Sequence, residues 1–116
     1  MNKNYDSNSA IDFADAISNL ISNIKKDYAN WSTWQEGIDR FNSSFDVKTG
    51  KKYTKIISNG SVWGFIAKDD GVHKGIPHKM GDVFKAAGWS APAKWARGSI
   101  FSDKKFYSWT GPNYLI

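Results

Sequence analysis

The sequence contains no cysteine, and this absence excludes both a disulfide framework and a metal site built on thiolates. It also contains no apolar run near the roughly 20 residues that a membrane-spanning helix needs. The first residues, MNKNYDSNSAIDF, lack the basic-then-apolar order of a secretory signal. We therefore expect a cytoplasmic protein that has no membrane contact.

The motifs of common enzyme classes are missing as well. There is no GxGxxG, no P-loop and no HExxH, and no nucleophile or carboxylate pair accompanies the two histidines, His73 and His78. Their spacing in a Gly- and Pro-containing segment, beside Asp69 and Asp70, matches no zinc pattern. We interpret the histidines as ordinary loop residues and expect no metal, no cofactor and no enzymatic activity.

Aromatic side chains and positive charge are what the chain has in excess. Its 116 residues fit one domain, and 16% of them are aromatic, including six Trp. Residues 1–46 hold four Lys or Arg against seven Asp or Glu, a net charge of −3, whereas residues 47–116 hold twelve against four, a net charge of +8. This asymmetry indicates either an acidic partner for the C-terminal two-thirds or a solvated lysine-rich surface.

Two stretches near the N-terminus have the apolar periodicity of helices. In residues 9–27, apolar side chains recur at spacings of three and four, and Ser9 can cap the first turn. Residues 31–42 repeat the pattern more weakly, with an aromatic stripe that we interpret as core packing. That stripe comprises Trp31, Trp34, Ile38 and Phe41.

The basic part, residues 47–116, has the pattern of strands. Two β-branched and aromatic runs flank Asn59-Gly60, a dipeptide that supplies the positive φ angles of a tight hairpin. Side-chain alternation predicts that Trp63 and Phe65 lie on one face of the sheet. We expect a loop at 69–80 and strands at 52–58, 61–68, 81–86 and 105–110.

Residues 91–97 are predicted to form a short helix. Ser90 is a good N-cap, Pro92 fits the first turn and Gly98 fits the left-handed position after the last turn. The expected fold is a single α+β domain in which two N-terminal helices pack on a small antiparallel sheet of three or four strands, with this short helix added.

The same stretch carries the candidate binding residues. A helix N-terminus at Ser90 would present free N–H groups to a phosphate, and cations and Trp rings surround it in the sequence. Buried Trp rings with cations at their edges are the alternative interpretation. The predicted nucleic-acid-binding residues are Lys52, Lys55, Lys85, Trp89, Ser90, Lys94, Trp95 and Arg97.

Residues 52–101 resemble a segment found in small proteins of tailed bacteriophages. The segment has a strand ending in Lys, then GDVFKAA, a Trp, an APA step and an ARG end, as SVWGFIAK and GDVFKAAGWSAPAKWARGSIF do here. The match departs from that pattern in its longer loop at 69–80, at Gly88 and at Ser99. The resemblance implies a role inside an infected bacterium and transfers no catalytic residue.

These observations favour a phage accessory protein that binds nucleic acid, DNA or RNA, without catalysis. One alternative is an inhibitor or modulator of an acidic host protein, since Trp, Tyr and Arg dominate protein interfaces. A minor virion or assembly component is a further alternative.

Overall fold

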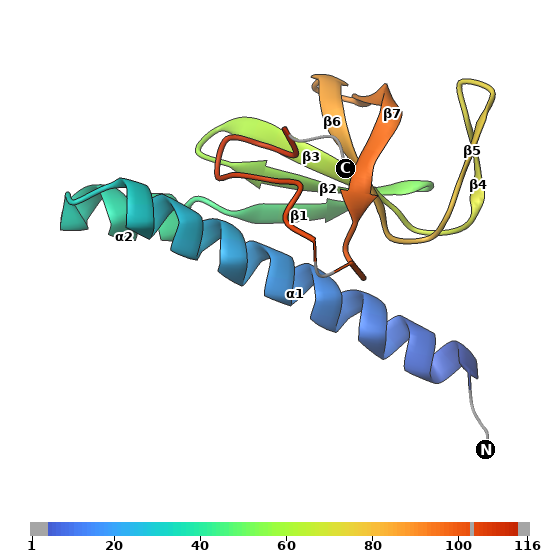
Figure 1. The fold of residues 1–116 in the computed structure, drawn as a ribbon, viewed down its shortest axis with the longest axis horizontal. Helices are drawn as coiled ribbons and strands as arrows, with labels where there is room; N and C mark the ends of the chain where they lie inside the picture. Colours follow the sequence, from blue (N-terminus) through green and yellow to red (C-terminus); the bar gives the residue numbers. More distant parts are fainter. Residues whose placement is uncertain (1–4, 103, 114–116) are drawn as a thin grey trace.

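The computed structural model describes residues 5–102 and 104–113 (Figure 1). Two helices, α1 (Tyr5–Trp31) and α2 (Gln35–Ser43), precede the strands. The strands are β1 (Asp46–Thr49), β2 (Tyr53–Ser58), β3 (Ser61–Ala67), β4 (Gly71–His73), β5 (Ile76–His78), β6 (Asp82–Gly88) and β7 (Ala91–Ser99).

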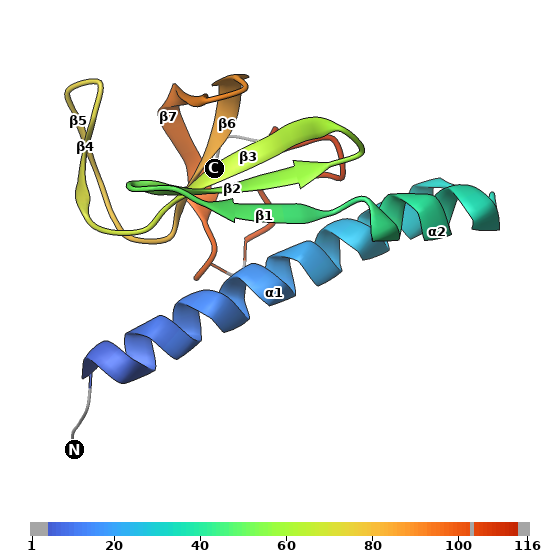
Figure 2. The ribbon, with the colours of Figure 1, turned by 180° about the vertical axis from the view of Figure 1, so that it is seen from behind.

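The strands form two antiparallel sheets. The main sheet has five strands in the order β1-β2-β3-β6-β7, and β4 and β5 pair as a separate hairpin inserted between β3 and β6. The predicted sheet of three or four strands is therefore wrong, because β1, β4, β5 and β7 lie in segments expected to be loop, turn or helix. α1 crosses beneath the sheet, and the β6–β7 hairpin rises away from it (Figures 1 and 2).

The hairpin between β2 and β3 confirms the Asn59-Gly60 prediction. Both residues have positive φ, 53° and 80°, and Ser58 pairs with Ser61 across them. Lys74 and Gly75 form the β4–β5 turn in the same way, with φ of 51° and 82°. Residues 69–80 are thus largely a hairpin and not the predicted loop, because a second two-residue turn of positive φ lets the chain fold back on itself.

The predicted helix at 91–97 is wrong, because the segment is strand β7. Gly88 pairs with Ala91, so Trp89 and Ser90 form a hairpin turn and Ser90 caps no helix. Helical preference there amounts to a few tenths of a kcal/mol per residue. That preference is smaller than the cost of leaving the backbone groups of β6 unpaired on that edge.

Gly98 is required for close packing and not for a helix end. Its φ is not positive, and a Cβ on Gly98 would lie 2.5 Å from the ring of Phe106. Phe106 is 1% exposed and belongs to the main core. The predicted strand at 105–110 is therefore wrong: its aromatic residues pack inward, and only an isolated bridge joins Ser108 to Gly111.

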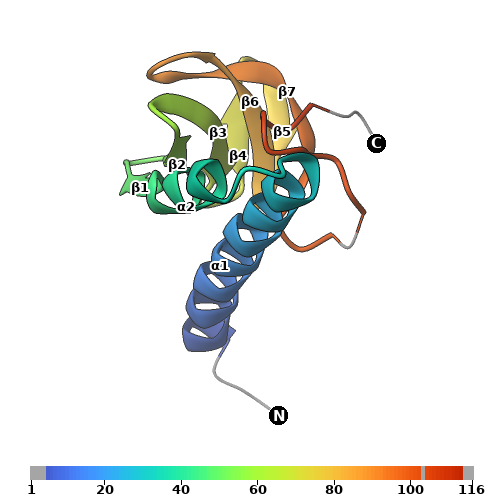
Figure 3. The ribbon, with the colours of Figure 1, turned by 90° about the vertical axis from the view of Figure 1, so that its left-hand side faces the viewer.

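The main core lies between α1 and one face of the sheet, as the end-on view shows (Figure 3). The predicted stripe of α1 supplies it, because Ile17, Leu20 and Ile24 are buried against sheet residues. The second predicted stripe is only partly right. Phe41 is buried, whereas Trp31 and Trp34 are exposed, because α1 continues to Trp31 and α2 begins after Trp34.

A β-bulge places Trp63 and Phe65 on opposite faces of the sheet, contrary to the prediction. Ile56 pairs with Gly64 and Ile57 with Val62, so Trp63 has no pairing partner in β2. An extra residue of this kind reverses the alternation that follows it. Trp63 lies in the main core, and its Nε1 donates a hydrogen bond to the Ser108 carbonyl (2.9 Å).

Asp27 joins the end of α1 to the C-terminal segment. Its carboxylate accepts hydrogen bonds from Lys105 Nζ and from the Trp109 backbone N–H, both at 2.8 Å. Burial alone would raise the pKa of Asp27, but these two hydrogen bonds and the charge of Lys105 outweigh it and hold the pKa below its ordinary value of 3.8.

We expect Asp27→Asn to lower the free energy of unfolding by about 0.5–1 kcal/mol at neutral pH, since the ion pair is partly exposed. A lowered pKa in the folded state means that the ionised carboxylate stabilises the fold fully above 3.8, and that this contribution is lost as the pH falls through the folded value. Urea denaturation of both proteins at neutral pH and at about pH 3 measures the difference. If the two proteins differ in their free energy of unfolding by the same amount at both pH values, the negative charge of Asp27 does not stabilise the fold.

Candidate nucleic-acid interface

An open pocket of about 290 Å³ lies beside the β1–β2 turn. Among the described residues, its lining contains four lysines and no Asp or Glu. We call it the basic pocket, and its lining residues are Lys48, Thr49, Gly50, Lys51, Lys52, Tyr53, Lys55, Phe65 and Ser90.

The β1–β2 turn fixes the backbone that carries two of these four lysines. The Gly50 N–H donates to the Tyr53 carbonyl (2.8 Å), and Lys68 Nζ donates to the Gly50 carbonyl (2.9 Å). The Lys68 N–H donates to the Lys52 carbonyl (3.0 Å). Since the backbone is held from both sides, the side chains of Lys51 and Lys52 project from a fixed turn into solvent.

Three acidic residues, Asp46, Asp69 and Asp70, lie near the pocket although they do not line it. Lys48 forms an exposed ion pair with Asp46 (3.3 Å), a contact that contributes little in water. Asp69 and Asp70 border a neighbouring hollow together with Lys51 and Lys52. Asp70 accepts a hydrogen bond from the Met80 N–H (2.9 Å). The lysines around the basic pocket outnumber these carboxylates, so their field stays positive but is reduced by Asp46, Asp69 and Asp70.

Aromatic rings lie within and beside the pocket. Tyr53 and Phe65 line it, and their ring centroids are 6.1 Å apart. Lys55 Nζ lies 5.9 Å from the Phe65 ring centroid and 4.7 Å from that of Trp89. Lys55 thus connects the pocket to the β6–β7 turn, where Trp89 is 56% exposed.

A second, smaller core supports the aromatic lining of the pocket. Phe65, Ala67 and Phe84 are buried on the sheet face opposite the helices, and Tyr53 packs against them. Burial raises the pKa of Tyr53 above its ordinary value of 10.0, so its hydroxyl stays protonated at neutral pH.

The β4–β5 hairpin covers this second core through its two histidines. The rings of His73 and His78 lie 5.4 and 5.8 Å from that of Phe84. His73 Nε2 lies 3.2 and 3.1 Å from the carbonyl oxygens of Pro92 and Ala93. Because both carbonyls only accept, Nε2 must carry the proton. His73 therefore attaches the hairpin to β7, and His78 packs on Phe84, so neither is merely an ordinary loop residue.

The structure brings together half of the predicted binding residues. Lys52, Lys55 and Ser90 line the basic pocket, and Trp89 lies beside it. The lining residues that are not among the predicted binding residues are Lys48, Thr49, Gly50, Lys51, Tyr53 and Phe65.

The other predicted residues lie outside the pocket lining. Lys94 and Trp95, both in β7, lie beside each other, with Lys94 Nζ 5.4 Å from the Trp95 ring centroid. Arg97 donates to the Asn113 carbonyl (3.1 Å). Lys85 is exposed and follows Phe84 along β6, so alternation directs it to the other face.

Among residues 5–102 and 104–113, no three His, Asp or Glu side chains gather in a way that could hold a metal ion. Neither described helix is long and apolar enough to span a membrane.

Comparison with known proteins gives one match. No curated protein and no solved structure matches this chain. A family model, that of DUF7717, matches residues 1–112, which covers both helices, both sheets and every residue of the basic pocket. The chain therefore belongs to DUF7717, a family of unknown function.

Proposed function

We propose that the protein binds nucleic acid without catalysis and that the basic pocket is its binding site. The observation that carries this proposal is the lining itself: four lysines without an acidic residue surround the partly exposed ring of Tyr53, which packs on the buried Phe65. Proteins that bind single strands combine a positive groove for the phosphates with aromatic rings for the bases. The pocket provides both features within one concave surface.

The pocket also has polar groups suited to phosphate oxygens. A lysine ammonium has three donors and tolerates many phosphate positions, and the Ser90 hydroxyl adds a neutral donor. Lys55 lies between the pocket and Trp89, so one side chain can contact a phosphate while the neighbouring ring contacts a base. Phosphate contacts supply affinity in such interfaces and carry no sequence information.

The proposal gives the predicted residues unequal roles. Lys52, Lys55, Trp89 and Ser90 belong to the site together with Lys48, Lys51 and Tyr53. Lys85, Lys94 and Arg97 contribute only to the general positive field, because they lie outside the pocket.

The resemblance of residues 52–101 to tailed-phage proteins supports a biological setting for this activity. A phage accessory protein in the host cytoplasm meets abundant single- and double-stranded nucleic acid. We propose that setting for this chain, with binding rather than chemistry as its contribution.

Fluorescence anisotropy with labelled single- and double-stranded DNA and RNA tests the proposal on nuclease-treated protein. We expect binding, and we expect the logarithm of the binding constant to fall linearly with the logarithm of salt concentration. If all four lysines contact a single strand, the slope should be about −3. Binding that does not change with salt, or no binding at low salt, would overturn the proposal.

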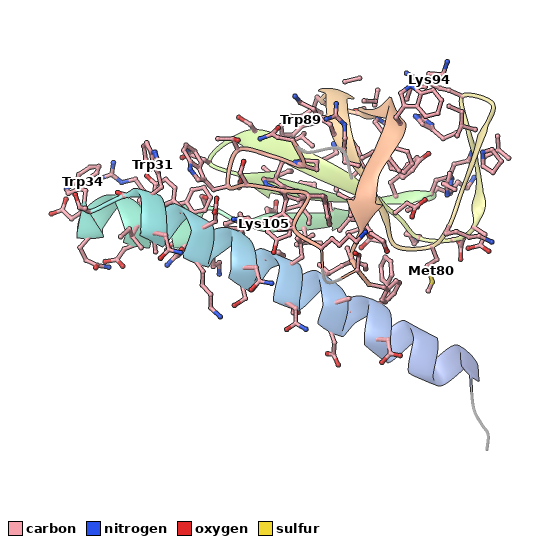
Figure 4. All side chains as sticks on the ribbon, in the orientation of Figure 1. Trp31, Trp34, Met80, Trp89, Lys94 and Lys105 are labelled. Carbon is pink, nitrogen blue, oxygen red and sulfur yellow. The ribbon has the colours of Figure 1, made fainter. Side chains whose placement is uncertain are left out.

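An exposed aromatic cluster at the other end of the molecule favours the second candidate, modulation of a host protein. Trp31 is 66% exposed and packs against Trp109, with ring centroids 5.0 Å apart. Trp34 lies close by at the start of α2, with Arg40 above its ring (Figure 4). A host protein that co-purifies after nuclease treatment, and that no longer does so with Trp31→Ala plus Trp34→Ala, would support this candidate.

A further inference from the structure

We infer that the basic pocket takes an unstacked base, so that the protein prefers a single strand to a duplex of the same sequence. This inference rests on the proposed function and specifies the form of nucleic acid that the site accepts. It follows from where the aromatic rings lie relative to the lysines.

The partly exposed ring of Tyr53 can be reached only by a base that has left its stack, and the Phe65 ring, which is 3% exposed, supports it from the second core. Tyr53 and Phe65 form part of the lining of a concave pocket, and lysines from the β1–β2 turn surround them. In a duplex the faces of the bases are covered by their neighbours, so its phosphates could meet the lysines while the rings stay unused. In single strands, bases stack directly on such rings.

The size of the pocket agrees with a single base. Its volume of about 290 Å³ is at the lower end of the range for small-ligand sites. Such an open pocket has room for one base with its phosphate. Among the described residues, the lining offers no carboxylate that would repel the phosphate.

Trp89 provides the stacking surface at the edge of the pocket. Lys55 covers part of its ring at 4.7 Å, yet the side chain is 56% exposed, so most of the indole remains open to a base. Trp89 occupies the β6–β7 turn, at the end of that hairpin remote from α1 (Figure 4). A base on Trp89 would place its phosphate near Lys55 and the lysines of the β1–β2 turn.

Trp95 offers a matched control. It lies on the same hairpin, is 59% exposed and has a lysine, Lys94, 5.4 Å from its ring centroid. Neither Trp is part of the pocket lining, but the lysine beside Trp89, Lys55, is a lining residue, whereas Lys94 is not. Trp89→Leu and Trp95→Leu therefore remove equally exposed rings beside equivalent cations, and they differ in their relation to the pocket.

The experiment measures anisotropy of a labelled single strand of about 15 nucleotides, and of its duplex, at about 50 mM salt. We expect the wild type to prefer the single strand. Trp89→Leu should weaken single-strand binding by at least about fivefold and change duplex binding by less than about twofold. Trp95→Leu should change neither. Circular dichroism and thermal melting of both variants establish that the fold is intact.

The outcomes separate this inference from the proposed function. Salt-sensitive binding that is equal for single strand and duplex, and indifferent to Trp89→Leu, would overturn the inference and leave the proposed function standing. If Trp89→Leu and Trp95→Leu reduce the affinity for the single strand equally, the inference is also overturned, because the ring beside the pocket would then contribute no more than the control ring. If neither form binds at low salt, both the inference and the proposed function fall.

Discussion

Replacing Lys51, Lys52 and Lys55 together by alanine is expected to weaken single-strand binding by about 100-fold at 0.1 M salt. Each lysine–phosphate interaction contributes about −0.7 to the slope of the logarithm of the binding constant against the logarithm of salt concentration. At 0.1 M salt, one such interaction therefore raises the binding constant about fivefold over its value at 1 M. The factors for three such interactions multiply to about 100-fold, and the slope should become less negative by about 2. Anisotropy titrations at several salt concentrations give both quantities.

The control for this triple variant changes the charge by the same amount elsewhere. Lys26, Lys85 and Lys104 are exposed and do not line the basic pocket, so their replacement by alanine also lowers the net charge by three. If binding depends on the pocket, the affinity of the control variant should fall only a few-fold. Equal reductions in both variants would show that the overall positive field is responsible and that the pocket has no special role.

The parts of the fold that follow from local chemistry are the ones that the sequence predicts. The apolar stripe of α1 needs only a spacing of three and four, and Ile17, Leu20 and Ile24 are buried as that spacing requires. The β2–β3 hairpin needs only the positive φ angles that Asn59 and Gly60 provide. In both cases the decisive interactions lie within a few residues along the chain.

The β7 strand shows where this kind of reasoning ends. Ser90, Pro92 and Gly98 stand at the positions of a capped short helix, and each has another role in the structure. The segment is a strand because β6 offers it a hydrogen-bonding edge, a partner that no local pattern reveals. Pro92 is compatible with this because β7 is at the edge of the sheet.

Only part of the candidate site is predictable from the sequence, for a related reason. Lys52 and Lys55 are recognisable as strand lysines, but Lys48 enters the pocket only because β1 pairs with β2. Phe65 faces the pocket because the bulge at Trp63 reverses the alternation. A bulge adds one residue to one strand, and nothing in the local composition of β3 marks it.

Removing the ring of Phe84 is expected to have the largest effect on stability. Phe84 is 2% exposed at the centre of the second core, where its ring lies 5.9 Å from that of Tyr53 and 5.4 and 5.8 Å from the two histidine rings. Phe84→Ala should lower the free energy of unfolding by about 3–5 kcal/mol, because a buried cavity replaces the packed ring. For a chain of this length, that corresponds to a fall in melting temperature of about 12–20 °C.

The comparison for Phe84→Ala is Trp95→Ala, which removes a larger ring from the paired strand β7. Trp95 is 59% exposed, so its removal should cost less than about 1 kcal/mol. Urea denaturation of both variants gives the two free energies, and amide hydrogen exchange reports on β4 and β5 separately. Because His73 and His78 pack on Phe84, exchange in residues 71–78 should accelerate in Phe84→Ala more than in Trp95→Ala. Equal costs for the two variants would mean that the second core adds little to stability and that the pocket lining it supports is held by the β1–β2 turn alone.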